Sequence, residues 1–240
     1  MELLKALYAI NSKSGKEVAL REFVRNILAD LDVTMVEDEL DNLFITKGRA
    51  EAYPCIVAHL DEVHDVDDRQ IVVEGDMIYA LNSEGERVGL GADDKNGVWI
   101  AIQLLRQQPI LQVALFAGEE KLGDLAGCRG SRGCSLEHFD KTKYLLQCDR
   151  KGASDIVVVG KNEVVLCGEK FFPDEVLQRY GFQRVSGGRT DVVALRERGL
   201  SKDCCNISCG YYNAHKTDEY TIFPELQNTL ALVTEIVGCL

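Results

Sequence analysis

Residues 53–61, with the sequence Tyr-Pro-Cys-Ile-Val-Ala-His-Leu-Asp, carry an apolar, strand-like run directly into an imidazole and a carboxylate. Two later segments repeat this arrangement, because residues 110–117 lead into Gly-Glu-Glu at 118–120 and residues 144–148 lead into Asp149. In open α/β sheets, ligands bind in the crevice outside the carboxyl ends of the strands, so polar groups far apart in sequence can converge there. The pattern predicts an α/β fold with a polar site at one edge of its sheet.

The composition of the chain limits the class of protein. With 240 residues, 46% of them apolar and 28% charged, the chain can bury one substantial core, and we expect a single catalytic domain over 1–240. The net charge of −12 disfavours nucleic acid and anionic membrane surfaces, since both favour basic patches. No stretch reaches the roughly 18 uninterrupted apolar residues that span a bilayer. We therefore expect a soluble protein whose partner is a small molecule or peptide.

The cysteines favour a reducing compartment. They are odd in number and lack the regular spacing of a secreted disulfide scaffold. Cys204, Cys205 and Cys209, or Cys128 with Cys134, are an alternative thiolate zinc site, but neither set has the C-x-x-C spacing. Most of the nine lie in apolar runs, so we expect small buried side chains and a cytoplasmic location.

Hydrophobic periodicity predicts the elements that carry these motifs. The capping-box pattern Ser14-Gly15-Lys16-Glu17 and the apolar residues after it predict a helix over about 15–31. The remaining predictions are strands at 33–36, 42–46 and 55–58, a hairpin over 71–79, and helices after Asp93, over 173–180, over 191–198 and from Pro224.

The histidines differ in their sequence context. A histidine two positions before an acidic residue is expected by chance in so acidic a chain, and His138-Phe139-Asp140 is one such match. His59-Leu60-Asp61 is preferred because it ends an apolar strand, where Asp61 can bind the far imidazole nitrogen and fix the tautomer of a ligating His59. We expect His59 and His215 to be metal ligands, His64 not to be one, and His138 to lie at the surface.

Adjacent carboxylates indicate a cation. Glu119 and Glu120 repel each other unless a metal or a shared proton offsets their charges. One carboxylate can then coordinate while its neighbour accepts a proton from the attacking water, as metal-assisted hydrolysis requires. Asp93 lies in the loop that opens a helix, and a helix N-cap at Asp93-Asp94 is the alternative. Oxygen and imidazole ligands suit Zn²⁺, Co²⁺ or Mn²⁺ in an open catalytic site.

Taken in order, these segments resemble the ligand series of the co-catalytic di-zinc exopeptidases, which include peptidase T, the aminoacylase and carboxypeptidase group and the compact zinc aminopeptidases. The matching motifs are His59-Leu60-Asp61, Gly91-Ala92-Asp93-Asp94-Lys95-Asn96-Gly97, Gly118-Glu119-Glu120, Cys148-Asp149 and Asn213-Ala214-His215. Residues 187–191 and 210–215 are also similar to the glycine-glycine-threonine-aspartate and glycine-x-x-asparagine-x-histidine segments of peptidase T-like enzymes. The resemblance runs from Ser14 to His215 and covers most of the chain.

The resemblance implies a three-layer α/β/α sandwich with a mixed, mostly parallel central sheet and two divalent metal ions, most readily Zn²⁺. It assigns His59 and Asp149 to one metal, Glu120 and His215 to the other, and Asp93 as the bridge between them. It further implies that Asp61 orients His59, that Glu119 is the general base, and that Asp93–Asp94 is a candidate cis peptide bond.

Three features depart from the family pattern. Only 66 positions separate Asp149 from His215, so the lid or dimerisation domain that peptidase T inserts there is expected to be absent. Arg189 interrupts the Gly-Gly-Thr motif and is a candidate for binding a substrate carboxylate with its planar fork, with a salt bridge, for example to Asp191, as the alternative. Tyr212 is a second candidate substrate-binding residue.

The implied function is that of a metal-dependent exopeptidase, an aminopeptidase or dipeptidase that hydrolyses short peptides. Within the same fold, an amidohydrolase of N-acyl amino acids and a carboxypeptidase remain open. A single-zinc glutaminyl cyclase and a non-catalytic binding relative are more distant alternatives. The sequence leaves the oligomeric state undetermined.

Overall fold

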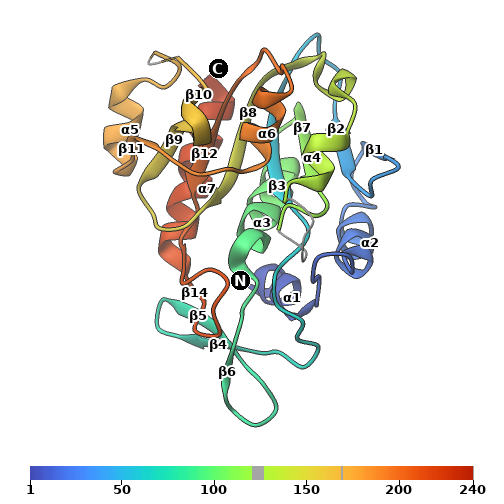
Figure 1. Ribbon diagram of the computed structural model, residues 1–240, viewed down its shortest axis with the longest axis vertical. Coiled ribbons are helices and arrows are strands. Elements are labelled where there is room, and N and C mark those ends of the chain that lie inside the picture. Colours follow the sequence, from blue (N-terminus) through green and yellow to red (C-terminus); the bar gives the residue numbers. More distant parts are fainter. Residues whose placement is uncertain (121–126, 169, 240) are drawn as a thin grey trace.

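A large twisted sheet with helices on both faces forms most of the molecule, and a smaller sheet adjoins one end of it (Figure 1). The structure is a computed structural model that describes residues 1–120, 127–168 and 170–239. The expected three-layer α/β/α class is confirmed.

The four central strands of the large sheet are parallel, and antiparallel strands flank them. The central strands are β7 (Leu111–Phe116), β3 (Tyr53–His59), β8 (Thr142–Arg150) and β12 (Asp203–Ser208). On the β7 side follow β2 (Leu43–Lys47) and β1 (Val33–Glu37); on the β12 side follow β9 (Asp155–Gly160), β10 (Val164–Val165) and β11 (Gln183–Ser186), of which β11 is parallel to β9. Because β7, β3 and β8 are neighbours and parallel, their carboxyl ends meet at one edge.

Both faces of the central strands are buried, since side chains alternate between two separate apolar clusters. In β3, Ile56 and Ala58 belong to the larger cluster, whereas Cys55 and Val57 belong to the smaller one on the opposite face. This alternation explains why β3 is apolar throughout rather than at every second position.

Helices cover the two faces unequally. The face of the larger cluster carries α1 (Glu2–Ala9), α2 (Val18–Ile27), α3 (Ala92–Gln107), α5 (Asp174–Tyr180) and α7 (Phe223–Cys239). The other face carries α4 (Arg129–Gly133), η1 (Leu136–Phe139) and α6 (Asp191–Glu197). The helices predicted after Asp93, over 173–180, over 191–198 and from Pro224 correspond to α3, α5, α6 and α7.

The first helices differ from the sequence prediction. The helix predicted over about 15–31 is shorter, because α2 spans Val18–Ile27. Ser14 does not cap it, and its hydroxyl instead donates to the Asp61 carboxylate at 2.6 Å, so the capping-box interpretation is wrong. The helix α1 was not predicted at all, although Leu4, Leu7 and Tyr8 form its buried face.

The smaller sheet contains the predicted hairpin, β4 (Gln70–Glu74) with β5 (Met77–Leu81), together with β6 (Arg87–Val88), β13 (Tyr211–Tyr212) and β14 (Tyr220–Ile222). The loop between β13 and β14 carries His215. Residues 150–168 and 170–210 complete the large sheet and its helices, with η2 (Lys161–Glu163) between β9 and β10.

All nine cysteines are free, and all but Cys239 are buried, as expected for small apolar side chains. In the part of the chain that the structure describes, no helix is both long enough and apolar enough to cross a bilayer.

Candidate metal centre

Side chains from five segments meet beside the carboxyl ends of β7, β3 and β8. His59 is the last residue of β3, Asp149 lies one residue before the end of β8, and Glu119 and Glu120 follow β7. Asp93 comes from the first turn of α3, and His215 from the β13–β14 loop. The structure therefore brings together every residue that the sequence proposed as a metal ligand.

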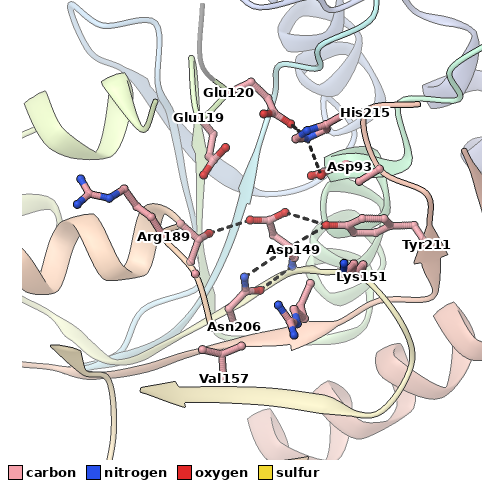
Figure 2. A pocket seen from close by; sticks show the side chains of 14 residues that line it. Asp93, Glu119, Glu120, Asp149, Lys151, Val157, Arg189, Asn206, Tyr211 and His215 are labelled. Atoms are coloured by element: carbon pink, nitrogen blue, oxygen red, sulfur yellow. Dashed lines mark hydrogen bonds and ion pairs between the residues drawn. The ribbon is translucent and has the colours of Figure 1, made fainter. Parts of the chain in front are cut away.

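Asp93 lies between the two histidines. Its Oδ1 is 3.1 Å from Nε2 of His59, and its Oδ2 is 3.3 Å from Nε2 of His215. On one side, His59 Nε2 is also 3.5 Å from Asp149 Oδ1; on the other, His215 Nε2 is 2.6 Å from Glu120 Oε1. Figure 2 shows Glu120, His215 and Asp93 in a row at one end of the cavity, with Asp149 beside them.

These distances define two triads with the spacing of metal ligands. His59, Asp93 and Asp149 form one, Asp93, Glu120 and His215 form the other, and within each triad the ligand atoms lie within 4.8 Å of one another. A third group, His59 with Glu119 and Glu120, meets the same distance limit. The first two triads use each histidine once and share Asp93, so they fit a pair of ions better than the third group does. In the described segments, no cysteine belongs to such a group.

The backbone at Asp93 departs from helical geometry. Asp93 and Asp94 have non-helical dihedral angles within α3, and the peptide bond between them is cis, as the family resemblance implied. Buried Glu219 accepts hydrogen bonds from the N–H groups of Asp93 and Gly91, at 3.2 and 2.6 Å. Asp93 is thus held from its backbone while its carboxylate faces the cavity.

Asp61 contacts both His59 and the glutamate turn. Its backbone carbonyl, rather than its carboxylate, makes the hydrogen bond to Nδ1 of His59, at 3.0 Å, while carboxylate Oδ1 lies 3.4 Å away. The carboxylate accepts from the N–H groups of Glu119 and Glu120, at 2.8 and 3.0 Å. Asp61 therefore does more than the sequence predicted, because it also fixes the turn that carries both glutamates.

Asp149 is held by polar neighbours. Its Oδ2 accepts from the Thr190 hydroxyl at 2.8 Å and from the Gln147 amide at 3.1 Å, and its N–H donates to Asn206 at 2.9 Å. The Tyr211 hydroxyl lies 3.5 Å from Oδ1. These contacts orient the carboxylate toward the cavity before any ligand binds.

Negative charge dominates the electrostatics of this cluster. Burial and the nearby Asp93 raise the pKa of Asp149 to about 7, and burial also raises the pKa of Glu120. Burial alone would lower the pKa of His59, but Asp149, Asp61 and Asp93 outweigh it and raise that pKa well above its usual value. Hydrogen bonds to Asp93 and Glu120 raise the pKa of His215 to about 10. In each case the side chains retain or recruit protons to offset unbalanced carboxylates.

Glu119 lines the same cavity, which has a volume of about 230 Å³. Burial is the main cause that raises its pKa well above the usual range, and Asp149, Asp191 and Glu120 add to the rise. The Cys128 thiol donates to Glu119 Oε1 at 3.3 Å. Glu119 is thus a carboxylate with a high proton affinity. It lies beside the two triads that share Asp93 and belongs to neither of them.

The two expected substrate-binding residues lie differently. Arg189 lines the cavity wall, but its guanidinium pairs with Glu197 at 3.3 Å, not with Asp191, and in Figure 2 it points away from Asp149. Tyr212 does not line this cavity but the adjoining one that shares Arg150, Lys151 and Ala214 with it. Its hydroxyl donates to Glu225 at 2.6 Å and its ring stacks on Tyr220. The neighbouring Tyr211 occupies the wall of the first cavity instead.

The remaining histidines lie outside the two triads. His64 Nε2 is 3.6 Å from Glu219 and belongs to none of the described metal groups. His138 was expected at the surface, but it is half-buried and stacks on Phe44 with ring centroids 3.8 Å apart. The surface position was predicted from the polar residues beside His138 in the sequence. That prediction was wrong, because η1 directs the ring onto Phe44 of the sheet.

Five residues of the cavity wall with polar groups were not assigned from the sequence: Arg150, Lys151, Thr190, Asn206 and Tyr211. Two carried a signal, since Arg150 and Lys151 follow Asp149 directly. Asn206 had none, because its position depends on the parallel pairing of β12 with β8.

Comparisons with known proteins agree on the fold. No family model matches the chain, and neither does any curated protein sequence. Among solved structures, an aminopeptidase PepT from Bacillus cereus superposes with a TM-score of 0.79 at 16% identity, over 98% of this chain and 96% of that one. A tripeptidase from Staphylococcus aureus gives 0.76 at 16% identity, over 98% and 95%, and the Pyrococcus horikoshii TET1 peptidase gives 0.72 at 16%, over 100% and 99%. The chain therefore has the fold of the peptidase T-like and TET-type aminopeptidases, as the motifs predicted.

Proposed function

We propose that this protein is a metal-dependent exopeptidase that removes residues from the amino terminus of short peptides. The observation that carries the proposal is the carboxylate of Asp93, whose two oxygens face two histidines that each have a further carboxylate beside them. The fold shared with aminopeptidases and a tripeptidase supports the same conclusion, although at 16% identity it is an argument from fold alone.

The donor set fits divalent cations. One cavity is lined by four carboxylates, those of Asp93, Glu119, Glu120 and Asp149. His215 also lines its wall, and the buried His59 lies within ligand distance of Asp93 and Asp149. Such a concentration of negative charge is costly in a buried site unless cations offset it. Imidazole and carboxylate ligands without thiolate suit Zn²⁺, with Co²⁺ or Mn²⁺ as alternatives.

We infer that His59, Asp93 and Asp149 hold one ion and that Asp93, Glu120 and His215 hold the other. Two such cations would lower the pKa of a bound water and polarise the scissile carbonyl. The shared use of Asp93 gives each ion three protein ligands, which leaves both positions open to water and substrate.

Glu119 is the proposed general base. It lies beside the ligand triads, and its raised pKa suits a group that takes a proton from the attacking water and passes it to the leaving amine. Asp61 positions this base, because its carboxylate holds the backbone N–H of Glu119 and its carbonyl holds His59. We assign Asp61 a positioning role for both residues.

We also propose that the catalytic unit works without an inserted lid. Between Asp149 and His215, the described residues form strands and helices of the large sheet and strand β13 of the smaller sheet, rather than a separate body over the cavity. The nine free thiols support a reducing compartment such as the cytoplasm.

Metal analysis of the purified protein, combined with a substrate panel, tests the proposal. Fully active protein is expected to hold two divalent ions per chain, to lose activity in chelator and to regain it with Zn²⁺, Co²⁺ or Mn²⁺. The panel pairs free dipeptides with their N-acetyl derivatives, and acetylation is expected to depress cleavage strongly. Full activity with one ion per chain contradicts the two-metal mechanism. Equal or faster cleavage of the acetylated peptides favours the amidohydrolase or carboxypeptidase alternatives instead.

A further inference from the structure

A second cavity continues outward from the candidate metal centre. It has a volume of about 430 Å³ and shares Arg150, Lys151 and Ala214 with the first cavity. The two cavities form one continuous depression, and we call the second cavity, including the shared residues, the outer groove. One end of the whole depression holds the metal ligands, and the other end opens to solvent.

The two ends differ in charge. Glu119, Glu120, Asp93 and Asp149 line the inner end, where the guanidinium of Arg189 is paired with Glu197. The outer groove is lined by Arg150, Lys151 and Lys216, with Asp155 as its one carboxylate among the described residues. Such a local excess of cations is unusual in a chain with a net charge of −12. In Figure 2, Lys151 lies beyond Asp149 on the Tyr211 side of the cavity, away from Glu119 and Glu120.

The two lysines of the outer groove have no carboxylate partner among the described residues. Asp155 neutralises Arg150, whose Nη2 lies 3.1 Å from the aspartate oxygen. Among the residues that the structure describes, no carboxylate lies within ion-pair distance of the ammonium of Lys151 or Lys216. Both side chains are exposed and free to meet an anion in the groove.

Backbone hydrogen bonds hold the segment that carries Lys151 in place. The N–H of Gly152 donates to the carbonyl of Tyr211 at 2.9 Å, and the N–H of Gly210 donates to the carbonyl of Gly152 at 2.8 Å. The Tyr211 hydroxyl in turn lies 3.4 Å from the carbonyl of Asp149. The segment with Lys151 is therefore tied to the segment that leads to His215, so the backbone from which the Lys151 side chain extends is held next to the metal ligands.

We propose that Lys151, with Arg150 and Lys216 beside it, binds the carboxyl-terminal carboxylate of a short peptide whose scissile bond lies at the metal centre. This inference rests on the proposed exopeptidase function and names its substrate class: dipeptides and tripeptides with a free carboxyl terminus. A zwitterionic peptide matches the depression, because its negative end meets the outer groove while its amino end lies toward the carboxylates. Charge complementarity of this kind gives selectivity more than raw affinity.

A peptide substrate with an acidic amino-terminal residue would offer a second carboxylate, that of its side chain, to the same cations. The geometry favours the carboxyl terminus, because the cations lie in a groove that leads away from the metal centre rather than in a closed pocket beside it. The experiment must therefore separate the two sources of the carboxylate.

The test compares three substrates on the metal-loaded enzyme: Leu-Ala, its carboxyl-terminal amide Leu-Ala-NH₂, and Glu-Ala-NH₂. For the wild type, kcat/KM for Leu-Ala is expected to exceed that for its amide by about tenfold or more, as for a hydrogen-bonded ion pair. Lys151→Met should remove most of this preference by slowing Leu-Ala about tenfold while changing the amide much less. Lys143→Met is the matched control, since it removes the same charge from an exposed position at the far end of β8 and should leave the preference intact.

Each result has a definite meaning. If the wild type cleaves Leu-Ala-NH₂ as well as Leu-Ala, the exopeptidase proposal stands and the carboxylate site is wrong. If Lys151→Met slows Glu-Ala-NH₂ selectively, the cations bind an acidic side chain, and the carboxyl-terminal proposal is overturned. If no substrate is cleaved with Zn²⁺, Co²⁺ or Mn²⁺ present, the proposed function fails, and this inference fails with it.

Discussion

Two buried polar clusters lie on either side of the first turn of α3, and they solve the problem of buried charge in opposite ways. In the first, which we call the ionic cluster, Glu62 contacts both Lys95 Nζ, at 2.7 Å, and Arg69 Nη1, at 2.9 Å. In the second, the candidate metal centre, carboxylates outnumber the chain's own cationic groups.

The ionic cluster supplies its single carboxylate, that of Glu62, with two cations. Glu62, Arg69 and Lys95 are each at most 7% exposed, and the Glu62 carboxylate bonds to both cations. Burial would raise the pKa of Glu62, but Lys95 and Arg69 outweigh it and lower that pKa. A buried charge with well-placed partners stays ionised, and the cluster joins the residues after β3 to α3.

In the metal centre, carboxylates are in excess instead. Burial and neighbouring acids raise the pKa values of Asp149, Glu119 and Glu120, so the carboxylates there resist ionisation. The comparison indicates that the chain can supply buried cations where it needs them, as it does at Glu62. Among the cationic groups of the described residues, only the imidazoles of His59 and His215 face Asp93; burial would raise its pKa, but they outweigh burial and lower it. Among the described residues no lysine or arginine forms an ion pair with a carboxylate of this centre, which supports a site built for cations from solution.

The largest expected effect comes from Glu119→Gln, which removes a proton acceptor without removing a proposed metal ligand. We expect kcat to fall by about 10²- to 10⁴-fold, the usual contribution of a positioned acid–base group. Metal content should stay at the wild-type value, as measured by elemental analysis. Glu120→Ala is the contrasting variant and should lose metal as well as activity. Near-normal turnover of Glu119→Gln would show that another group moves the proton.

A large effect on stability is expected for Glu62→Gln, which keeps the shape of the side chain but leaves Arg69 and Lys95 without their shared carboxylate. Breaking a buried charge pair in this way typically costs about 3–5 kcal/mol. Urea unfolding followed by circular dichroism measures the loss, with and without chelator. The exposed Glu51→Gln should change stability by less than about 0.5 kcal/mol. A similarly small change for Glu62→Gln would mean that the ionic cluster is not what distinguishes the two regions.

Residues whose position follows from local pattern were predictable from the sequence. His59, Glu119, Glu120 and Asp149 each follow an apolar strand, and strand ends of a parallel sheet converge. The family resemblance supplied Asp93 and His215, which lie in loops without such a pattern. The fold class followed from the same alternation of apolar strands and helices.

Residues whose position depends on tertiary contacts were not predictable in this way. Ser14 matches a capping box, but the Asp61 carboxylate is the acceptor that its hydroxyl reaches. Tyr211 and Tyr212 are adjacent in sequence, and only the orientation of β13 decides that Tyr211 lines the cavity. Arg189 pairs with Glu197 because α6 brings that carboxylate back toward it. Local sequence carries no information about these partners.

The effect of Asp149→Asn on the free energy of unfolding is expected to change sign when metal is added. In chelator-treated protein at pH 8, Asp149→Asn should stabilise the fold by about 1–2 kcal/mol, because it removes a carboxylate whose pKa is raised to about 7. With saturating Zn²⁺ the wild type should be the more stable protein, since metal at about 100 times its Kd adds about 2.7 kcal/mol that the variant lacks. Thermal unfolding in both conditions measures the crossover. An Asp149→Asn variant that is less stable even without metal would indicate that its hydrogen bonds to Thr190 and Gln147 dominate.

The last prediction concerns the pH dependence of stability and Asp191, a buried carboxylate that accepts from the Ser131 hydroxyl at 2.5 Å and from Gln147 at 3.3 Å without facing the proposed ions directly. Burial is the main cause that raises its pKa from 3.8 to about 7. Because the folded protein then binds a proton more tightly than the unfolded chain, Asp191 contributes stability at low pH and loses it as pH rises toward 7. The slope between those values is about 1.4 kcal/mol per pH unit for one proton. Asp191→Asn should remove this slope in chelator-treated protein, whereas Asp140→Asn, at an exposed position, should not. Urea unfolding at pH 5, 6, 7 and 8 measures the free energy of unfolding of the three proteins. Parallel plots of this free energy against pH for wild type and Asp191→Asn would show that Asp191 stays ionised throughout, as the carboxylate of Glu62 does in the ionic cluster.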